Sequence, residues 1–311
     1  MPALYRHLDD LPRLLRGGVV SIGNFDGVHC GHASIVQRLL GMARSLDVPA
    51  IILTFDPHPA RLLRPEQAPM PLSWTDYKAQ LLCQLGVDAV VAYPTDRALL
   101  ALAADEFFQQ IVLGKLQARG MVEGRNFYFG HNRGGDIEVL ACFCGLAGIP
   151  LEVVEPARID GQVVSSSRVR QLIAAGQVAE AARLLARPYR IRGAVIHGQG
   201  RGNRLGFPTA NVGGIDMLLP GPAIYAGRAW IDGQPYTTAM SLGSNPTFDE
   251  SELKVEAFLL DYHGDLYGRA IEIDFLSRLR DIKRFDSAEQ LVVQMALDVE
   301  QTRKIAGELR T

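Results

Sequence analysis

Along the first 186 residues, short apolar runs alternate with stretches in which apolar positions recur every three or four residues. The short runs predict buried strands and the periodic stretches predict amphipathic helices. Strands are expected over residues 18–22, 50–55, 88–92, 120–129 and 151–154, and helices over residues 32–46, 75–85, 105–116 and 166–175. Because strands that alternate with helices form βαβ units, this part of the chain predicts a parallel sheet covered on both faces.

The pattern changes after Pro188, where short runs rich in β-branched and aromatic residues follow one another without helices between them. These runs cover residues 191–196, 223–231, 236–242, 254–261 and 270–275. Asp232-Gly233 is typical of a two-residue hairpin turn. Such strands predict an antiparallel barrel, with a sandwich as the alternative. A final helix is expected over residues 288–309, with Ser287 and Gln290 forming a capping box.

The change of pattern predicts two domains, residues 1–186 and 187–311, which agrees with the length of 311 residues. The net charge of −2 shows no basic excess, so we expect neither nucleic acid nor a membrane surface as a partner. The four cysteines match no zinc or disulfide framework. Because we find no signal peptide and no apolar run long enough to span a membrane, we expect a cytoplasmic protein.

The first candidate for chemistry is SIGNFDGVHCGH at residues 21–32, directly after the first expected strand. Its glycines, Gly23 among them, permit a tight turn into the next helix. There His29 and His32 are placed to donate ring N–H bonds to phosphate oxygens beside the positive end of the helix. Two alternatives stay open: the histidines are capping or solvated residues, or they hold a metal together with His58.

A second set of phosphate donors is VSSSRVR at residues 164–170. Hydroxyl groups at a helix start, such as that of Ser166, and a guanidinium such as that of Arg170 suit a leaving phosphate. The alternative is a serine N-cap followed by exposed arginines. Because the chain has no G-x-x-x-x-G-K-[ST] motif, the donors favour nucleotidyl transfer over a P-loop ATPase.

The third candidate is HGQGRGNRLGFPTANV at residues 197–212. Its glycines do not have the spacing of a dinucleotide-binding fingerprint, but the backbone of Gly198, Gly200 and Gly202 can surround phosphates. Thr209 and Asn211 are two residues apart in an extended segment, so both present an oxygen on the same side. Such oxygens suit Mg²⁺. The alternative is a loop whose polar side chains bond to their own backbone.

Together with TFDPHP, NFYFGHNRGGD at residues 126–136 and KVEAFLLDY at residues 254–262, these motifs resemble the prokaryotic bifunctional riboflavin kinase/FMN adenylyltransferase family, over nearly the whole chain. The resemblance implies an α/β nucleotidyltransferase domain of the HxGH type, followed by a riboflavin kinase barrel with a C-terminal helix. It implies phosphorylation of riboflavin to FMN in the second domain and adenylylation of FMN to FAD in the first.

The resemblance also assigns roles in the first domain. ATP and its phosphates are expected to contact Gly23, Asn24, Asp26, His29, His32, His58, Ser166 and Arg170. The flavin is expected to contact Asn126, Phe127 and Phe129. The family usually has an acidic residue where Asn126 stands, so the affinity for FMN is an open question.

In the second domain, the resemblance implies that Thr209 and Asn211 hold Mg²⁺–ATP and that Glu256 accepts the proton of the riboflavin hydroxyl. The sequence alone leaves open whether Glu256 points into the barrel or into solvent. Expected small-molecule partners are riboflavin, FMN and ATP, with Mg²⁺ as cofactor. Two alternatives remain, a kinase with weak or no adenylyltransferase activity and an inactive flavin-binding regulator.

Overall fold

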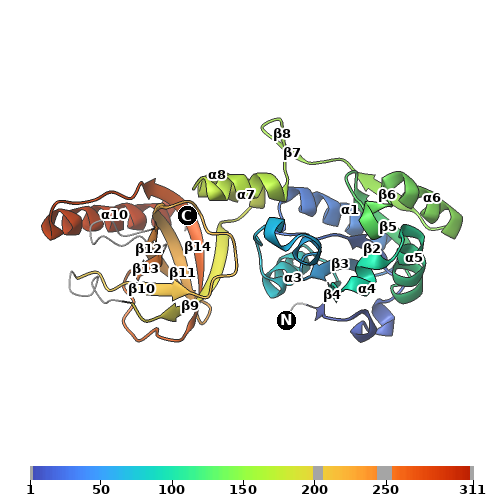
Figure 1. Cartoon of the computed structure of the whole chain (residues 1–311), viewed down its shortest axis with the longest axis horizontal. Helices are drawn as coiled ribbons and strands as arrows, with labels where there is room; N and C mark the ends of the chain where they lie inside the picture. Colours follow the sequence, from blue (N-terminus) through green and yellow to red (C-terminus); the bar gives the residue numbers. More distant parts are fainter. Residues whose placement is uncertain (1–2, 199–205, 244–253, 309–311) are drawn as a thin grey trace. The chain divides into compact units, whose positions relative to one another are not determined.

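The computed structural model describes residues 3–198, 206–243 and 254–308 (Figure 1). Gly200 and Gly202 therefore lie outside the described residues. The chain forms two compact units: Met1–Pro69 with Ser73–Ser165, and Met70–Leu72 with Ser166–Thr311. Within the described ranges, no helix is both long and apolar enough to cross a membrane.

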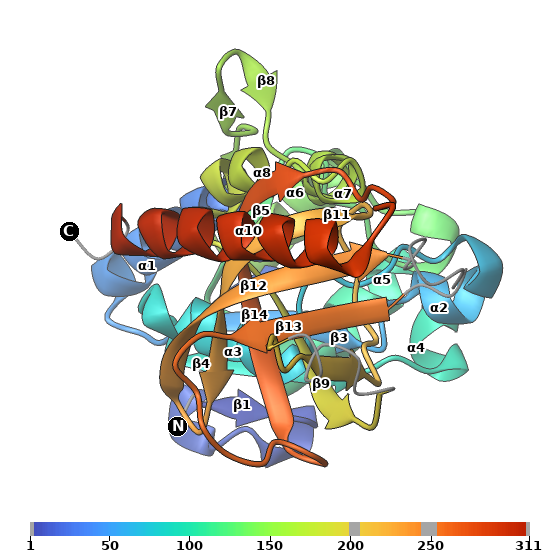
Figure 2. The same cartoon turned by 90° about the vertical axis from the view of Figure 1, so that its left-hand side faces the viewer.

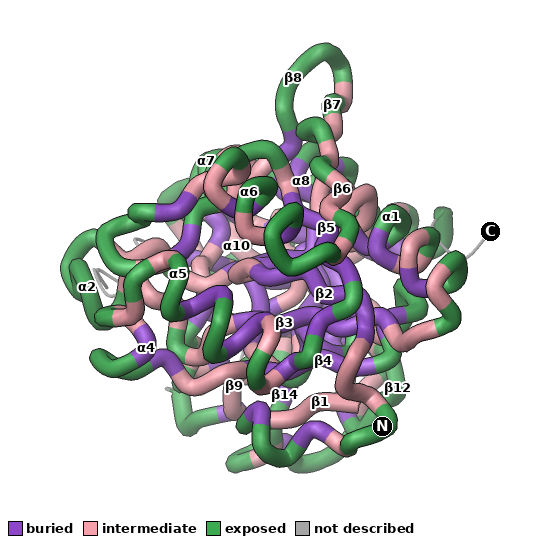
Figure 3. Tube along the Cα trace, turned by 90° about the vertical axis from the view of Figure 1, so that its right-hand side faces the viewer, coloured by how far each residue is buried: buried purple, intermediate pink, exposed green. Residues whose placement is uncertain are grey.

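The first unit is built on a six-stranded parallel sheet with the strand order β1-β4-β3-β2-β5-β6. The strands are β1 (Leu4–Tyr5), β2 (Val19–Ile22), β3 (Ala50–Asp56), β4 (Ala89–Pro94), β5 (Gly120–Gly124) and β6 (Leu151–Val154). Val19 pairs with Ala50 of β3 on one side and with Gly120 of β5 on the other, so β2 is central. Figure 3 shows β2, β3 and β4 as mostly buried, as strands covered on both faces must be.

Helices cover both faces of this sheet. They are α1 (Cys30–Leu46), α2 (Ala60–Leu63), α3 (Thr75–Gln84), α4 (Arg97–Ala101), α5 (Ala104–Phe107), the π-helix Phe108–Lys115 and α6 (Ile137–Ala147). On one face, residues of β2, β3, β4 and β5 form a continuous apolar core with α4, α5, the π-helix and α6. The connections through α1 to β3 and through α3 to β4 run toward one edge of the sheet, whereas those through α4 and α5 to β5 and through α6 to β6 run toward the other edge. Right-handed crossovers in opposite directions place their helices on opposite faces, so α1 and α3 cover the other face.

The expected parallel sheet is confirmed, with several differences in its elements. The strand expected over residues 120–129 ends at Gly124, because the chain turns there and the Phe127 amide donates to the Gly124 carbonyl. The helix expected over residues 105–116 is a short α-helix that continues as a π-helix. Strand β1 and helix α6 were not expected from the sequence.

The second unit is a closed antiparallel barrel with the strand order β10-β13-β12-β11-β14-β9. Its strands are β9 (Tyr189–Ile196), β10 (Ala210–Gly213), β11 (Ala223–Ile231), β12 (Gln234–Gly243), β13 (Lys254–Leu259) and β14 (Ala270–Arg280). Tyr189, Tyr225 and Phe275 are fully buried in its core, and side chains of this kind each stabilise a fold by about 1.5–3 kcal/mol. The barrel alternative is thus confirmed over the sandwich, and β10 is an additional strand.

The expected hairpin turn is also confirmed. Ile231 of β11 pairs with Gln234 of β12, and the two residues between them have positive φ angles, 49° at Asp232 and 79° at Gly233. Positive φ at both central positions defines the type I′ turn that Asp-Gly favours.

Helices α7 (Ser166–Ala174), α8 (Val178–Leu185) and α10 (Ala288–Glu308) also belong to the second unit. Helix α8 packs on β14 and β9, so packing joins it to the barrel. The proposed boundary at residues 186 and 187 therefore stays a prediction beside this division at Ser166. In Figure 2, α10 lies across the outside of the barrel and it contacts β11, β12 and β14. At its start the Ser287 hydroxyl accepts from the Gln290 amide, which is half of the expected capping box.

Candidate functional site

The turn between β2 and α1 is held in an uncommon backbone conformation. Phe25, Gly27 and Val28 have positive φ angles of 45°, 80° and 40°. The buried carboxylate of Asp26 accepts bonds from the Ser73 amide and hydroxyl, at 3.2 and 3.3 Å, and the Ser73 hydroxyl accepts from the Gly27 amide at 3.1 Å. Asp26 thus fixes the shape of the turn through Ser73, and its predicted contact with ATP stays a prediction.

His29 and His32 form a capping box at the start of α1, which begins at Cys30 rather than at His32 as expected. The Nδ1 atom of each ring accepts the backbone amide of the other residue, both at 3.3 Å, and the rings stack with centroids 3.7 Å apart. Because each Nδ1 is an acceptor, the proton of a neutral ring lies on Nε2. The helix start therefore carries two ring N–H donors beside its own positive end, as a phosphate site requires.

Asn24 precedes this turn and contributes a buried acceptor. Its carbonyl oxygen accepts a bond from the Thr54 hydroxyl at 3.0 Å. Its side-chain Oδ1 is buried and has no hydrogen-bond partner within the described parts of the chain. An unpaired buried acceptor costs about 1–3 kcal/mol, and a ligand that donates a hydrogen bond removes that cost. Next to it, the Gly23 amide donates to the Leu53 carbonyl at 3.0 Å and joins the turn to β3.

Lys78 of α3 lies near the same turn, and it is outside the motifs from which site residues were predicted. Its buried Nζ donates to the Thr54 hydroxyl at 3.3 Å. Burial lowers the pKa of Lys78, and the charges of Asp26 and Asp56 offset part of this effect. In the sequence Lys78 is one of several polar positions in a helical stretch, so only the fold identifies it as a buried amine near the site.

His58 is the remaining residue of the first unit for which contact with ATP is predicted. His58 lies two residues before α2, and its Nδ1 accepts the amide of Ala60, the first residue of that helix, at 3.1 Å. Among the described residues, no group of three or more His, Cys, Asp and Glu side chains could hold a metal, so the geometry does not support the metal alternative for the histidines.

The three residues expected to contact flavin differ in exposure. Asn126 is exposed, Phe127 is half-buried and Phe129 is buried. The Phe127 and Phe129 rings stack at a centroid distance of 5.4 Å, and Phe129 also contacts Phe107 and Phe143. Phe129 is therefore part of the core, and Phe127 and Asn126 are the more accessible of the three. Their contact with flavin stays a prediction.

Ser166 and Arg170 belong to the second unit, in α7. Ser166 is the first residue of this helix, and the Arg170 Nε donates to the Met70 carbonyl at 2.9 Å. The arginine is half-buried, unlike the exposed arginine of the alternative interpretation. The roles of both residues toward a triphosphate stay predictions.

In the barrel, Asn211 and Glu256 are direct register partners on β10 and β13. Val255, Ala257 and Leu259 are buried in the barrel, and Glu256 alternates with them on the outward, half-buried face. This placement answers the question that the sequence left open. It also sets an amide and a carboxylate side by side, because directly opposed residues have Cβ atoms about 4.5–5.5 Å apart.

Gly198 lies close to this pair. A Cβ atom at Gly198 would collide with the Asn211 side chain, so this position admits only glycine without a shift of Asn211. Thr209 precedes β10 and is half-buried like Asn211. Hydroxyl and amide oxygens are hard donors, which fits a site for Mg²⁺ that keeps most of its other ligands from phosphate and water.

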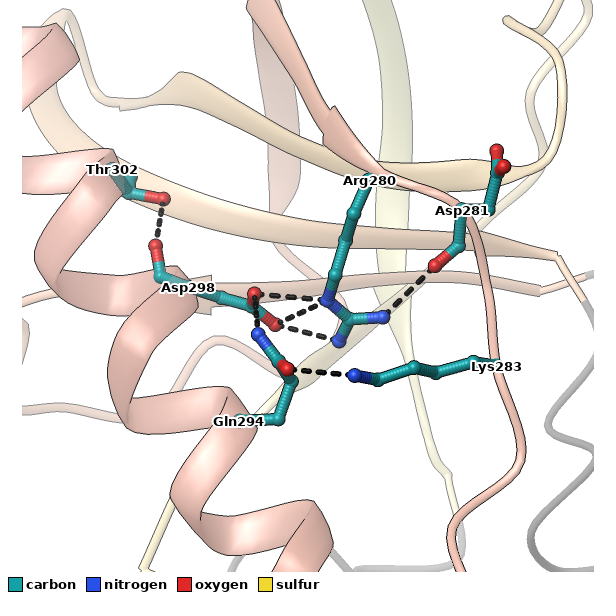
Figure 4. Close-up of polar contacts among 6 residues, drawn as sticks. All are labelled: Arg280, Asp281, Lys283, Gln294, Asp298 and Thr302. Atoms are coloured by element: carbon teal, nitrogen blue, oxygen red, sulfur yellow. Dashed lines mark hydrogen bonds and ion pairs between the residues drawn. The ribbon is translucent and has the colours of Figure 1, made fainter.

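The pair is part of a row that runs around the outside of the barrel. The row, linked by consecutive register pairs, consists of Ile196, Asn211, Glu256, Ser241, Ile224 and Arg280. At its end, Arg280 binds both oxygens of Asp298 in α10, with Nε to Oδ1 at 2.9 Å and a terminal nitrogen to Oδ2 at 2.7 Å (Figure 4). Gln294 donates to the same carboxylate at 3.0 Å. Sequence reasoning missed this anchor, because nothing in either segment indicates that they meet.

Two family models match the chain, FAD synthetase over residues 11–168 and riboflavin kinase over residues 185–306. A protein of Pseudomonas fluorescens with the name bifunctional riboflavin kinase/FMN adenylyltransferase is 37% identical, and the match covers 98% of each chain. A protein of Escherichia coli K12 with the same name is 34% identical, over 94% of this chain and 93% of that one. A solved structure from Streptococcus pneumoniae, named macrolide-efflux protein, is 30% identical with a TM-score of 0.86 and covers 96% of this chain and 98% of that one.

Proposed function

The chain belongs to the family of bifunctional riboflavin kinases/FMN adenylyltransferases, and on this premise we propose which residues serve each of its two reactions. Riboflavin is phosphorylated to FMN in the barrel unit, and FMN is adenylylated to FAD in the parallel-sheet unit. ATP is the co-substrate of both steps.

In the adenylyltransferase step, a phosphate oxygen of FMN attacks the α-phosphorus of ATP, and pyrophosphate leaves. The FMN phosphate already carries between one and two negative charges at pH 7, so it needs no base. The required contribution is stabilisation of the charge that builds on the phosphate oxygens. The Nε2–H groups of His29 and His32 and the start of α1 supply it. The roles of Ser166 and Arg170 toward the triphosphate, which the family resemblance implies, stay predictions.

Three further groups complete this site. Asn24 Oδ1 accepts a hydrogen bond from the bound ligand, which is supported by its lack of a partner among the described residues. Gly23 and His58 line the nucleotide pocket, with Asp26 shaping it. Phe127, Phe129 and Asn126 place the flavin.

In the kinase step, the riboflavin 5′-hydroxyl attacks the γ-phosphorus of ATP, ADP leaves, and the Glu256 carboxylate takes the hydroxyl proton. A neutral alcohol gains from a positioned base during this attack, unlike the FMN phosphate. Thr209 and Asn211 hold Mg²⁺, which neutralises charge on the ATP phosphates when bound. Gly198, with Gly200 and Gly202 of the same loop, surrounds the phosphates.

The observation that carries this assignment is the register pair of Asn211 and Glu256. Strands β10, β13 and β12 bring Asn211, Glu256 and Ser241 next to one another on the outside of the barrel. These residues offer an amide oxygen, a carboxylate and a hydroxyl group. A carboxylate beside a cation ligand is what transfer of a phosphoryl group to an alcohol needs.

Incubation of the purified chain with riboflavin, ATP and Mg²⁺ tests the proposal. We expect FMN and then FAD on chromatography. FMN without FAD favours the kinase with weak or no adenylyltransferase activity, and bound flavin with neither product favours the flavin-binding regulator. Omission of Mg²⁺ is expected to stop FMN formation. The proposal includes a cytoplasmic location and riboflavin, FMN and ATP as small-molecule partners, with neither nucleic acid nor a membrane among the partners.

A further inference from the structure

Glu123, near the end of β5, is a buried carboxyl that neither reaction above uses. Its exposed fraction is 2%. Its Oε1 accepts the backbone amide of Ile22, the last residue of β2, at 2.7 Å. This bond joins the ends of β2 and β5 through a side chain at a point where parallel strands are ordinarily joined by backbone pairs alone.

The place of this bond in the sheet is special. The chain proceeds from β2 toward β3 and β4 on one side, and from β5 toward β6 on the other. The order therefore reverses between β2 and β5, and open α/β sheets bind ligands in the crevice at the carboxyl ends of such strands. Ile22 continues directly into Gly23 and Asn24, and Glu123 continues into the turn that carries Asn126 and Phe127.

The surroundings of Glu123 are largely uncharged. Its register partner in β6 is Val153, and β2 presents Ser21 and Ile22 to it. From α6 the buried Cys144 thiol faces it, and burial followed by the Glu123 charge raises the pKa of Cys144 to about 11. Burial raises the pKa of Glu123 well above its usual range, and the bond from the Ile22 amide offsets only part of this effect.

We propose that Glu123 is a positioning residue of the adenylyltransferase step, which holds the end of β2 through the Ile22 amide and acts in its protonated, uncharged form. This proposal rests on the proposed function of the parallel-sheet unit. The accepted bond fixes the strand end from which the Gly23–Asn24 turn and then the His29 cap follow. The bound proton keeps negative charge out of the crevice in which the phosphates of FMN and ATP bind.

Charge state matters here because phosphate groups are anions. A carboxylate in the crevice repels them, and this repulsion is weakly screened by solvent at a buried position. Loss of the proton therefore weakens the binding of FMN and ATP while leaving the catalytic groups in place. The effect appears as a rise in KM at alkaline pH, with a smaller change in kcat.

Two full-length variants separate the bond from the proton. Glu123→Gln keeps a carbonyl acceptor for the Ile22 amide and cannot ionise, and Glu123→Met has a similar volume but no acceptor. We measure kcat and KM for FMN and ATP between pH 6 and about 9.5, where a raised carboxyl pKa can titrate. Riboflavin kinase activity of the same preparation serves as the internal control.

At pH 7 we expect Glu123→Gln to retain adenylyltransferase activity and Glu123→Met to raise KM about three- to tenfold, as for one lost hydrogen bond. As the pH rises through the raised pKa of Glu123, we expect KM to rise in the wild type and to stay level in Glu123→Gln. The same pH profile in both proteins overturns the proposal. Absence of FAD formation in the wild type instead contradicts the proposed function itself.

A spectroscopic measurement keeps the proposal testable if Glu123→Met does not fold. The infrared difference spectrum between wild type and Glu123→Gln at pH 7 is expected to contain the carbonyl band of a protonated carboxylic acid. A carboxylate band in its place overturns the role of the uncharged form, whatever the activities are.

Discussion

Asn211 and Glu256 lie directly opposite each other on antiparallel strands β10 and β13, on the outside of the closed barrel. The amide oxygen of Asn211, a hard ligand, thus lies beside the carboxylate of Glu256, which is half-buried and faces away from the barrel core. Neither residue packs in the apolar interior, so substitution of either is expected to change chemistry more than folding.

Glu256→Gln is expected to lower the kcat of FMN formation about 10²- to 10⁴-fold, because a positioned base contributes this much. Conversion of supplied FMN to FAD should be nearly unchanged. Chromatography of both products measures the two rates in one preparation. Glu300→Gln on the exposed side of α10 is the matched control. Loss of both activities in Glu256→Gln would show that the two steps are not separable.

His29→Asn is expected to give the reverse result. Asparagine is a favoured N-cap residue, so it can accept the His32 amide as the His29 ring does now, but it lacks the Nε2–H donor. We expect FAD formation to fall about 10- to 1,000-fold, as for one lost donor to transition-state charge, with little change in thermal stability. His29→Ala, which removes donor and cap together, should in addition lose about 1 kcal/mol of stability. An unchanged rate of FAD formation in both variants would contradict the phosphate role.

Gly198→Ala is expected to damage the kinase alone. The added Cβ collides with the Asn211 side chain, which must then move, and a misplacement of about 1 Å near a reacting centre can cost about 10²-fold in rate. We expect higher Mg²⁺ and ATP requirements for FMN formation. Gly307→Ala, whose Cβ meets nothing within 4 Å in α10, serves as control and should keep full activity. A kinase that tolerates alanine at position 198 would argue against Asn211 as a ligand.

Asp298→Ala is expected to destabilise the chain through the Arg280 guanidinium. The two side chains are only 19% and 8% exposed, so removal of the carboxylate leaves a largely buried cation without its partner. Such losses cost about 3–5 kcal/mol, and we expect the lower end of this range because Arg280 is partly solvated. Urea unfolding measures the change. Arg303→Ala on the same helix breaks an exposed ion pair with Asp261, which lies after β13, and this variant should unfold at nearly the wild-type urea concentration.

Stability is expected to fall as the pH rises, through Glu123. Burial raises the pKa of Glu123 in the folded chain, whereas the unfolded chain has the ordinary value of about 4.3. Between these two values the folded state binds more protons than the unfolded state, so each rise in pH costs stability. The contribution is complete below the ordinary value and is lost as the pH passes through the raised one. Urea titrations from pH 5 upward should show a shallower decline in Glu123→Gln. Parallel declines would mean that the carboxyl is already ionised in the fold.

Much of the architecture was predictable because it depends on local pattern. Apolar runs between helical stretches are sufficient to predict the parallel sheet, and Asp232-Gly233 is sufficient to predict a hairpin of the barrel, since both depend on neighbours in sequence. The strand expected to reach Phe129 ended at Gly124, because a turn and the aromatic core near Phe129 override a run of apolar residues. Strand β10 was missed because its four residues carry no clear alternation.

The candidate sites divide in the same way. The residues alone are sufficient to show that histidines and glycines follow the first expected strand, that a Thr-x-Asn segment lies in the second half, and which family these motifs resemble. Three features become visible only in the folded chain: His29 and His32 cap the helix through Nδ1, Glu256 faces outward beside Asn211, and Glu123 of β5 accepts the amide of Ile22 in β2. Motifs are local and can be read along the chain. Burial, register and the proton on a side chain depend on segments about 100 residues apart, such as Ile22 and Glu123, and these meet only in the folded protein.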